Sequence, residues 1–526
     1  MLQIKSHILF LILILGICNC AHFLSNNLRN LHEVPEKPRS SGIVMHISSL
    51  PSKFGIGTLG KEAFKFVDFL VKAKQKNWQM LPLGPSEDLG CPYCAKSSYA
   101  GNPYFIDLEI LIEEKLLDLG ETSSVFWGKN PSRVDFRILL EKRIKVLEKA
   151  FRKFKPDGNY KKFVEENKKW LDDYALYMAL KEKFNESSWI EWPEDIRKRT
   201  KTAVKKYTQE LKSKIDLHKF IQFKFYEQFE KLKNYCHEKN IKLIGDVPIY
   251  VPLDSVDVWA SPEYFQLDAD LKPLYVSGVP PDAFTADGQR WGNPLYDWEK
   301  MKKNNYQWYV DRLGAAGKLF DVIKIDHFRG LESYYAIPAE EPTARNGKWV
   351  KGPDMGLINA IKKNLPSIEF IVEDLGFLSR EVYELKINSG FPGMNVLEFA
   401  FDGDNSIYLP HNYIRNSVCY AGTHDNEILN KWSKDLPQSS RDRAEKYLNL
   451  PKNANLRKPI LRAGMGSVSY LFLAQIQDWL GCAGEARMNK PGIIDDSNWS
   501  WRAKPGEIND KLADEIADLT QLYGRY

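Results

Sequence analysis

Short apolar runs that end in or precede an acidic residue recur along this chain, and they constrain its fold more than any other feature. The runs lie at residues 42–47, 78–83, 241–246, 320–326, 369–373, 394–399 and 418–423. Asp246, Asp326, Glu373 and Asp425 close or follow four of them. Nearly continuous apolar runs are typical of parallel strands that are buried on both faces. Because helical stretches separate the runs, the sequence predicts a parallel sheet or barrel.

The position of the acids favours a barrel. An acidic side chain is costly in an apolar interior, whereas polar groups just past the strand C-termini of a (β/α)8 barrel gather on the face where catalysis occurs. We therefore predict an α/β fold, a (β/α)8 TIM barrel with helical insertions over residues 41–526 and no C-terminal β-sandwich domain. The length of 526 residues also allows two or three domains, but such barrels reach well over about 400 residues with insertions.

A long helical insertion is expected between the second and third strands, at about residues 109–238. Within it, Ile144, Leu147, Phe151 and Phe154 stand at helical spacing among lysines, arginines and glutamates. This spacing predicts an amphipathic helix whose charged face is solvated. The insertion is a candidate helical subdomain beside a substrate groove.

The N-terminus has the pattern of a secretory signal. A lysine precedes an apolar run at residues 8–17, and Cys18 and Cys20 supply small residues at the −3 and −1 positions of a cleavage site. The run is shorter than the roughly 20 apolar residues that span a bilayer. We predict a signal peptide at residues 1–20, a linker or second targeting segment at residues 21–40, entry into the secretory pathway and no stable membrane insertion. A buried first helix or an uncleaved anchor is the alternative.

Charge and cysteine usage exclude several functions. The net charge is only +5, and no basic stripe favours nucleic-acid binding. Seven cysteines would become five after loss of the signal peptide, an odd number that does not suit a disulfide scaffold. Cys91 and Cys94 form one isolated CxxC motif, and no second pair or suitably spaced histidines follow to complete a zinc site. A thioredoxin-like redox site stays open as an alternative.

Three of the acids suit chemistry at a glycosidic bond. Cleavage with retention requires a nucleophile and an acid/base whose carboxyl groups lie about 5–5.5 Å apart. Lys324 and Asp326 are two residues apart, so on a strand they face the same way and the cation favours the ionised carboxylate. Glu373 directly follows the apolar residues 370–372, which can help it keep a proton. Asp425 fits a third carboxylate that grips sugar hydroxyls. The alternatives are a structural ion pair and a capped loop turn.

Together and in this order, these motifs resemble the amylomaltase or disproportionating enzyme family, glycoside hydrolase family 77, over about residues 41–502. The resemblance implies a 4-α-glucanotransferase that moves α-1,4-glucan segments to the 4-hydroxyl of an acceptor glucan or glucose by retaining double displacement. It makes Asp326 the nucleophile, Glu373 the acid/base and Asp425 the transition-state stabiliser. Its partners would be α-1,4-glucans and maltooligosaccharides, and it implies no metal and no organic cofactor.

The same resemblance implies a set of substrate-binding residues. These are Tyr93, Asp246, Asp282, Gln289, Trp291, Lys324, His327, His424 and Asn489. Tyr93 would stack on the sugar at the point of cleavage, and residues 278–294 match the mobile loop on the acceptor side. Lys324 stands where the family nearly always has arginine, so the planar fork that can hold a carboxylate through two hydrogen bonds is missing. Ala283 resembles the plant plastid type of this loop. With the N-terminal signal, the expected destination is secretion or a plastid-like organelle.

Two other functions remain open from the sequence. An α-amylase-type hydrolase would use the same three carboxylates, but such enzymes usually carry a C-terminal β-domain, and only about 24 residues follow Arg502. A glucan-binding protein that has lost catalysis would explain Lys324, although the intact acids argue against it.

Overall fold

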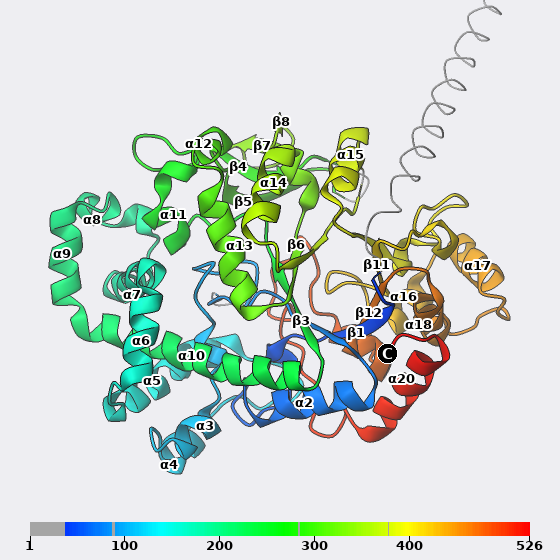
Figure 1. The fold of residues 1–526 in the computed structure, drawn as a ribbon, viewed down its shortest axis with the longest axis horizontal. Coiled ribbons are helices and arrows are strands. Elements are labelled where there is room, and N and C mark those ends of the chain that lie inside the picture. Colours follow the sequence, from blue (N-terminus) through cyan, green and yellow to red (C-terminus); the bar gives the residue numbers. More distant parts are fainter. Residues whose placement is uncertain (1–36, 87–89, 282–284, 377) are drawn as a thin grey trace, which may run out of the picture. The chain divides into compact units, whose positions relative to one another are not determined.

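The computed structural model describes residues 37–86, 90–281, 285–376 and 378–526. The chain divides into residues 1–38 and residues 39–526, and every helix and strand that Figure 1 labels belongs to the second unit. The predictions for residues 1–20 and for most of residues 21–40 therefore lie outside the described residues, as does Asp282.

Eight parallel strands form the centre of this unit. They are Ser40–Val44 (β1), Asn77–Gln79 (β2), Lys242–Val247 (β3), Val322–Ile325 (β6), Glu369–Val372 (β9), Gly393–Val396 (β10), Ser417–Tyr420 (β11) and Leu471–Gln475 (β12). Their order in the sheet is β10-β11-β12-β1-β2-β3-β6-β9, which is their order along the chain, with the cycle opened between β9 and β10. Val372 N donates to Pro392 O at 3.0 Å across that opening. The predicted (β/α)8 barrel is confirmed.

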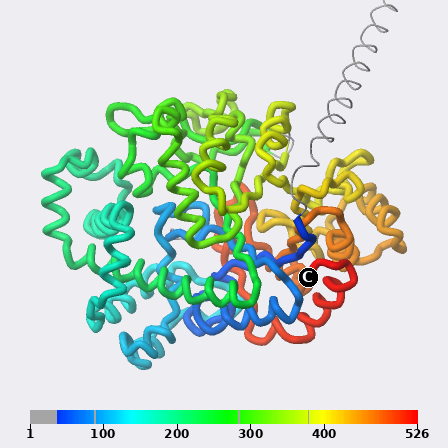
Figure 2. The backbone as a smooth tube through the Cα atoms, viewed as in Figure 1, coloured from blue at the N-terminus to red at the C-terminus, as the bar shows by residue number. Residues whose placement is uncertain are grey.

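Helices lie between successive barrel strands and around the sheet (Figures 1 and 2). The helices outside the β2–β3 connection are Lys61–Lys72 (α2), Val256–Ala260 (α11), Trp298–Lys303 (α12), Gln307–Leu319 (α13), Asp354–Asn364 (α14), Arg380–Ser389 (α15), Leu429–Asp435 (α16), Gln438–Tyr447 (α17), Arg457–Gly466 (α18), Ile476–Leu480 (α19) and Asp510–Leu522 (α20). Outward strand residues such as Trp78 and Leu243 pack with helix residues such as Phe66 and Leu232 in one core cluster.

The connection from β2 to β3 is mainly helical from residue 108 to residue 238. It contains Leu108–Glu113 (α3), Leu119–Ser123 (α4), Phe136–Lys153 (α5), Gly158–Glu166 (α6), Lys168–Lys183 (α7), Glu194–Arg197 (α8), Lys201–Glu210 (α9) and Lys212–Glu238 (α10). The amphipathic helix expected from Ile144, Leu147 and Phe151 is α5, in which Leu147 is buried. Asp135 caps it by accepting a hydrogen bond from Ile138 N, as aspartate does at helix N-termini.

A second, antiparallel sheet was not expected from the sequence. It has the order β5-β4-β7-β8, from Gln289–Pro294 (β5), Tyr275–Val279 (β4), Ser333–Pro338 (β7) and Lys348–Lys351 (β8). The two ends of the segment expected to be a mobile loop, residues 278–279 and 289–294, thus belong to a sheet. The partner strand β7 lies beyond β6 in the chain, so the pairing is not visible in the local sequence pattern.

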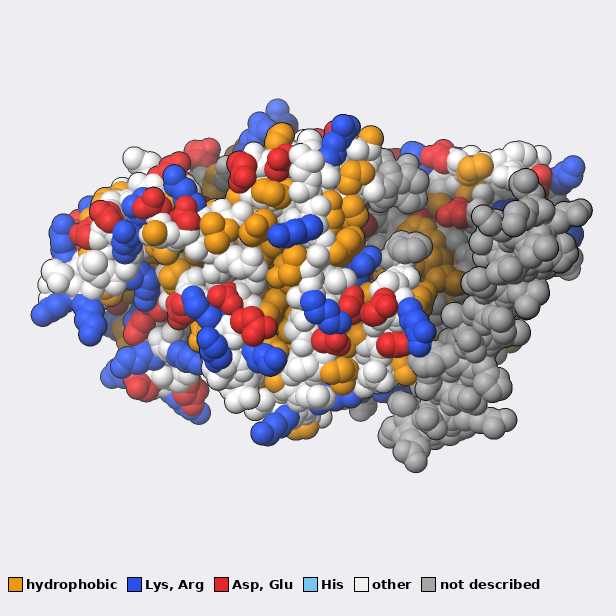
Figure 3. Space-filling view, turned by 90° about the horizontal axis from the view of Figure 1, so that it is seen from above, with side chains coloured by type: hydrophobic (Ala, Val, Ile, Leu, Met, Phe, Trp, Pro, Cys, Tyr) orange, Lys and Arg blue, Asp and Glu red, His pale blue; other side chains and the backbone are white. Residues whose placement is uncertain are grey.

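Charges of both signs are distributed over the surface. On the face seen in Figure 3, lysines and arginines alternate with aspartates and glutamates across the described part of the chain. Within the described residues, no helix is long and apolar enough to cross a membrane.

Candidate active site

The inside of the barrel changes from apolar to charged along its axis. Alternate strand residues face inward, and Ile244, Val322 and Ile371 form an apolar cluster there. Asp246 and Lys324 come two residues later on β3 and β6, so they face the same interior, side by side in the strand register. Both are buried. The alternation of the strands therefore places an acid and a base on top of the apolar layer, toward the strand C-termini.

Backbone hydrogen bonds continue one residue past the strand ends and fix two further acids. Asp326 N donates to Val247 O at 3.0 Å, and Glu373 N donates to Ile325 O at 2.9 Å. These bonds extend the ladder of the barrel beyond β6 and β9. The backbone of both acids is consequently held by neighbouring strands and not by a free loop.

One ammonium group contacts three carboxylates. Lys324 Nζ lies 2.9 Å from Asp246 Oδ2, 3.2 Å from Asp326 Oδ1 and 2.7 Å from Glu373 Oε2. The Lys324 side chain is only 3% exposed, whereas those of Asp326 and Glu373 are 25% and 24% exposed. Because the last two oxygens contact one nitrogen, they lie no more than about 6 Å apart, and the two carboxyl groups also share a hydrogen bond. The two carboxyl groups that face the solvent are therefore also the two that can meet a ligand.

Different neighbouring charges shift the pKa values of the two partly exposed acids, Asp326 and Glu373. Burial, and then the negative charge of Asp326, raise the pKa of Glu373 to about 7. Burial also raises the pKa of Asp326, but Lys324 acts in the opposite direction. The hydrogen bond between the two carboxyl groups lowers the pKa of Asp326 and raises that of Glu373. The contacts of the pair therefore favour the proton on Glu373 and the negative charge on Asp326.

A second polar cluster follows β11. Asn489 Nδ2 donates to Asp425 Oδ1 at 2.6 Å, and His424 Nε2 lies 3.3 Å from the same oxygen. Arg487 Nη2 donates to the Asp425 backbone oxygen at 2.6 Å, and its Nε donates to Asn489 O at 2.7 Å. The guanidinium thus joins the loop after β11 to the segment that carries Asn489. Arg487 was not predicted as a site residue.

Tyr93 joins the two clusters. Its hydroxyl donates to Asp246 Oδ2 at 2.8 Å, and its ring stacks on His424 with centroids 5.2 Å apart and an interplanar angle of 17°. Trp499 packs against both rings, at 5.8 Å from each. Asp246, Asp326 and Asp425 all contribute to raising the pKa of Tyr93, after burial. Acids from β3, β6 and β11 therefore surround one phenol. Trp499 was not predicted as a site residue.

Three of the other predicted binding residues lie together on the β6 side. Trp291 on β5 meets the ring of His327 edge-on, with centroids 4.8 Å apart. Trp291 Nε1 donates to Gln289 Oε1 at 3.2 Å. His327 adopts a left-handed backbone conformation, φ 46°, directly after Asp326. Burial lowers the pKa of His327 to about 4, so its imidazole is neutral at neutral pH. Trp291 is 38% exposed and offers a ring face to a ligand.

His46 is a further residue that the sequence analysis did not select. It follows β1, is buried, and its Nδ1 has no hydrogen-bond partner among the described residues. Burial and then His424 lower its pKa to about 3. A histidine after an apolar strand carries the same positional signal as the four acids.

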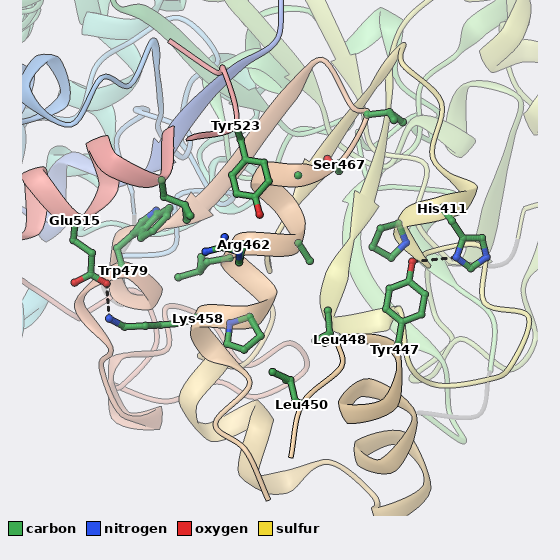
Figure 4. A pocket seen from close by; sticks show the side chains of 17 residues that line it. His411, Tyr447, Leu448, Leu450, Lys458, Arg462, Ser467, Trp479, Glu515 and Tyr523 are labelled. Carbon is green, nitrogen blue, oxygen red and sulfur yellow. Dashed lines mark hydrogen bonds and ion pairs between the residues drawn. The ribbon is translucent and has the colours of Figure 1, made fainter. Parts of the chain in front are cut away.

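The described residues contain no group of three or more histidines, cysteines, aspartates or glutamates arranged to hold a metal ion. A cavity of about 690 Å³ lies elsewhere, between residues of α17, α18 and α20, including Tyr447, Arg462 and Tyr523 (Figure 4). No residue predicted for the site lines that cavity.

Comparison with known proteins gives consistent matches over almost the whole chain. A family model described as 4-alpha-glucanotransferase matches residues 45–508. The 4-alpha-glucanotransferase of Clostridium butyricum is 48% identical over 486 residues, covering 91% of this chain and 100% of that protein. The 4-alpha-glucanotransferase of Streptococcus pneumoniae is 43% identical over 495 residues, covering 93% and 98%.

A solved structure matches the fold equally well. The amylomaltase from Streptococcus agalactiae, in complex with acarbose, superimposes with a TM-score of 0.90 at 39% identity. The match covers 93% of this chain and 99% of that one.

Proposed function

The chain belongs to the family of 4-alpha-glucanotransferases, and we propose that Asp326, Glu373 and Asp425 carry its reaction by retaining double displacement. In this reaction an α-1,4-glucan segment moves from a donor to the 4-hydroxyl of an acceptor glucan or glucose. The observation that carries the proposal is the shared contact of Lys324 Nζ with Asp326 at 3.2 Å and with Glu373 at 2.7 Å. It keeps two carboxyl groups next to each other, as the nucleophile and the acid/base of a retaining reaction have to be.

The first step uses the two acids in opposite protonation states. Ionised Asp326 attacks the anomeric carbon of the donor while protonated Glu373 gives its proton to the leaving 4-oxygen. The raised pKa of Glu373, about 7, supports its role as the acid. Lys324 supports the ionised state of Asp326, because its cation lowers the pKa of that carboxyl group. The products are a shortened glucan and a covalent glycosyl ester on Asp326.

The second step reverses these roles. Glu373, now ionised, removes a proton from the 4-hydroxyl of the acceptor, and the acceptor oxygen displaces Asp326 from the anomeric carbon. The α configuration is restored after two inversions. Glu373 regains its proton, so both acids return to their starting states.

The second cluster supports distortion of the reacting sugar. Asp425, held by Asn489 at 2.6 Å and flanked by His424, would accept hydrogen bonds from sugar hydroxyls that strengthen as the ring flattens. Tyr93 would stack on the same ring, and His327, neutral at neutral pH, would bind a hydroxyl next to the nucleophile. Asp246 would hold Tyr93 and Lys324 in place. Each of these roles is a proposal that mutation can test.

Transfer to a glucan requires that an acceptor competes with water. Trp291, with its exposed ring, and Gln289 beside it would hold glucose units of the acceptor. We include Asp282 in this acceptor site on the basis of the sequence alone. An ordered acceptor reacts as an intramolecular partner, which favours transfer over hydrolysis.

Incubation with maltotriose tests the proposal. A transferase yields glucose and a ladder of longer oligomers, whereas a hydrolase yields mainly glucose and maltose. We expect the ladder, and we expect Asp326→Asn to abolish it while a thermal unfolding scan shows a folded chain. Glucose and maltose without longer products would favour hydrolysis. Wild-type turnover by Asp326→Asn would overturn the assignment of the nucleophile.

We also propose that residues 1–20 are a signal peptide that directs the chain into the secretory pathway, that residues 21–40 are a linker or second targeting segment, and that residues 41–526 are the catalytic domain. The sequence pattern of residues 8–20 supports it. Fusion of residues 1–40 to a fluorescent protein tests it. Fluorescence in the secretory route or a plastid-like organelle is the expected result, and diffuse cytosolic fluorescence would contradict the proposal.

A further inference from the structure

The CxxC motif lies directly against the active site, and the catalytic proposal does not use its thiols. Cys91 and Cys94 flank Tyr93, and Cys94 N donates to Cys91 O at 3.2 Å, which closes a tight turn. Inside that turn, the Cys94 thiol donates to Cys91 Sγ at a sulfur–sulfur distance of 3.1 Å. A disulfide requires about 2.05 Å between the sulfurs, with the two Cα atoms about 4.4–6.8 Å apart. A turn of this size brings the Cα atoms within about 7 Å.

We propose that Cys91 and Cys94 form a reversible disulfide that shifts Tyr93 and thereby lowers transferase activity. The pair is accessible, since Cys94 is exposed and Cys91 is half-buried. The other described cysteines are less suited to exchange. Cys236 and Cys419 are buried, and burial raises the pKa of each to about 12. Burial likewise raises the pKa of Cys482 to about 12. The hydrogen bond from Cys94 instead lowers the pKa of Cys91, which favours the reactive thiolate.

The reaction is a thiol–disulfide exchange with a small-molecule disulfide such as oxidised glutathione. The Cys91 thiolate attacks one sulfur of the reagent, forms a mixed disulfide and releases one thiolate. Cys94 loses its proton, attacks Cys91 Sγ and releases the second thiolate. Two protein thiols are thus oxidised by two electrons, and one reagent disulfide is reduced to two thiols.

The consequence for the site follows from the contacts of Tyr93. The two cysteines lie on either side of Tyr93 in the chain. Formation of the disulfide shortens the distance between their sulfurs by about 1 Å from 3.1 Å. The Tyr93 hydroxyl bonds Asp246 Oδ2 at 2.8 Å, and Lys324 Nζ contacts the same oxygen at 2.9 Å. Asp246 Oδ1 has no hydrogen-bond partner among the described residues. Loss of the Tyr93 bond therefore leaves Lys324 as the main partner of Asp246 and draws the ammonium away from Asp326 and Glu373.

The experiment compares purified enzyme in dithiothreitol with enzyme in oxidised glutathione. Alkylation followed by mass spectrometry reports the thiols, and maltotriose disproportionation reports the activity. We expect a disulfide within the peptide that contains residues 91–94. We also expect kcat/KM to fall at least about fivefold on oxidation and to recover with dithiothreitol, because a misplacement of about 1 Å can cost up to about a hundredfold.

Three variants make the test specific. Cys91→Ser should have the same activity in both reagents, whereas Cys482→Ser should respond as the parent does. Cys94→Ser should stop at the mixed disulfide, so its mass should show one bound glutathione and no disulfide within the peptide. Equal activity of the oxidised and reduced parent, no disulfide at residues 91–94, or a response that persists in Cys91→Ser would overturn the proposal. The effect on activity rests on the proposed function, but the thiol measurement does not. A chain that is inactive in both reagents would refute the catalytic proposal. Mass spectrometry would still show whether the disulfide forms.

Discussion

Lys324 illustrates what a single residue contributes and what sequence can say about it. The spacing of Lys324 and Asp326 predicted that they face the same side of a strand, and their contact at 3.2 Å agrees with this. The contacts of the same ammonium with Asp246 and Glu373 could not be predicted from spacing. They depend on the register of β3 and β9 against β6, which is set by pairing between distant segments.

Replacing either central acid by its amide tests the roles at the residue scale. Asp326→Asn removes the nucleophile and Glu373→Gln removes the transferable proton, so kcat should fall by about a thousandfold or more in each. Disproportionation of maltotriose measures the loss. The matched control is Asp270→Asn. It changes an exposed acid that is not among the predicted site residues and should keep full activity. A loss of less than tenfold in Glu373→Gln would refute its role.

The pH dependence of kcat/KM follows from the same pair. The first step requires protonated Glu373, whose pKa is raised to about 7, so kcat/KM should fall as the pH rises through about 7. It should also fall at low pH, where Asp326 becomes protonated. A pH series of initial rates measures this profile, with circular dichroism at each pH as the control for unfolding. A flat profile from pH 6 to pH 8 would contradict the assigned acid.

Removal of the shared cation provides another test at this scale. Lys324→Met removes the positive charge next to Asp326 and Glu373, which raises the pKa of both carboxyl groups and favours the neutral form of the nucleophile. We expect kcat/KM to fall by at least about a hundredfold at pH 6. Lys324→Arg keeps the charge and should stay within about tenfold of the parent. Equal activities of the two variants would show that the charge is not what matters at this position.

At the scale of elements, the antiparallel sheet supplies one wall of the site. Its strand β5 carries Trp291 and Gln289, and its strands come from the connections that follow β3 and β6. The sequence resemblance selected these two residues but implied a mobile loop. The sequence did not predict the sheet, because β4 precedes β6 in the chain and its partner β7 follows β6. The eighth barrel strand, β12, was also missed, because its apolar run continues into α19 and has no acid at its end.

Trp291→Ala tests the contribution of this wall. If the exposed ring holds acceptor sugars, its loss removes about 1 kcal/mol of stacking and should raise the KM for the acceptor about fivefold. The share of hydrolysis should rise as well, because water then competes better. Product ratios from maltotriose measure both effects. Trp349→Ala, a tryptophan of similar exposure on β8, is the matched control. An unchanged product ratio in Trp291→Ala would refute the acceptor role.

For the whole molecule, the apolar runs with terminal acids predicted the barrel correctly, and the resemblance predicted the family that the comparisons show. The contacts that join the ends of the described unit were beyond prediction. Arg525 is fully buried and donates to Met465 O and Ser40 O, and Arg39 donates to Met465 O and Ser467 O. Two arginines more than 480 positions apart thus bond the same carbonyl. No local pattern marks either of them.

Arg525→Ala tests whether this connection stabilises the barrel. The substitution removes the hydrogen bonds that the buried guanidinium donates to the carbonyls of Met465 and Ser40, which should cost about 2–4 kcal/mol in the free energy of unfolding. Chemical denaturation measures the change. Lys458→Ala breaks an exposed ion pair with Glu515 and should cost less than about 1 kcal/mol. Equal stability of Arg525→Ala and the parent would contradict the expected contribution.

The three carboxylates around a single ammonium also determine the charge balance of the catalytic cycle. In the resting state of the proposed mechanism Asp326 is negative, Glu373 is neutral and Lys324 is positive. In the glycosyl intermediate Asp326 is an uncharged ester and Glu373 is negative, so the total is the same. The proposed reaction therefore moves one negative charge between neighbouring side chains without creating or removing any. No counter-ion has to enter or leave the barrel between the two steps, and a neutral polymer can be cut and rejoined in a pocket whose electrostatic field hardly changes.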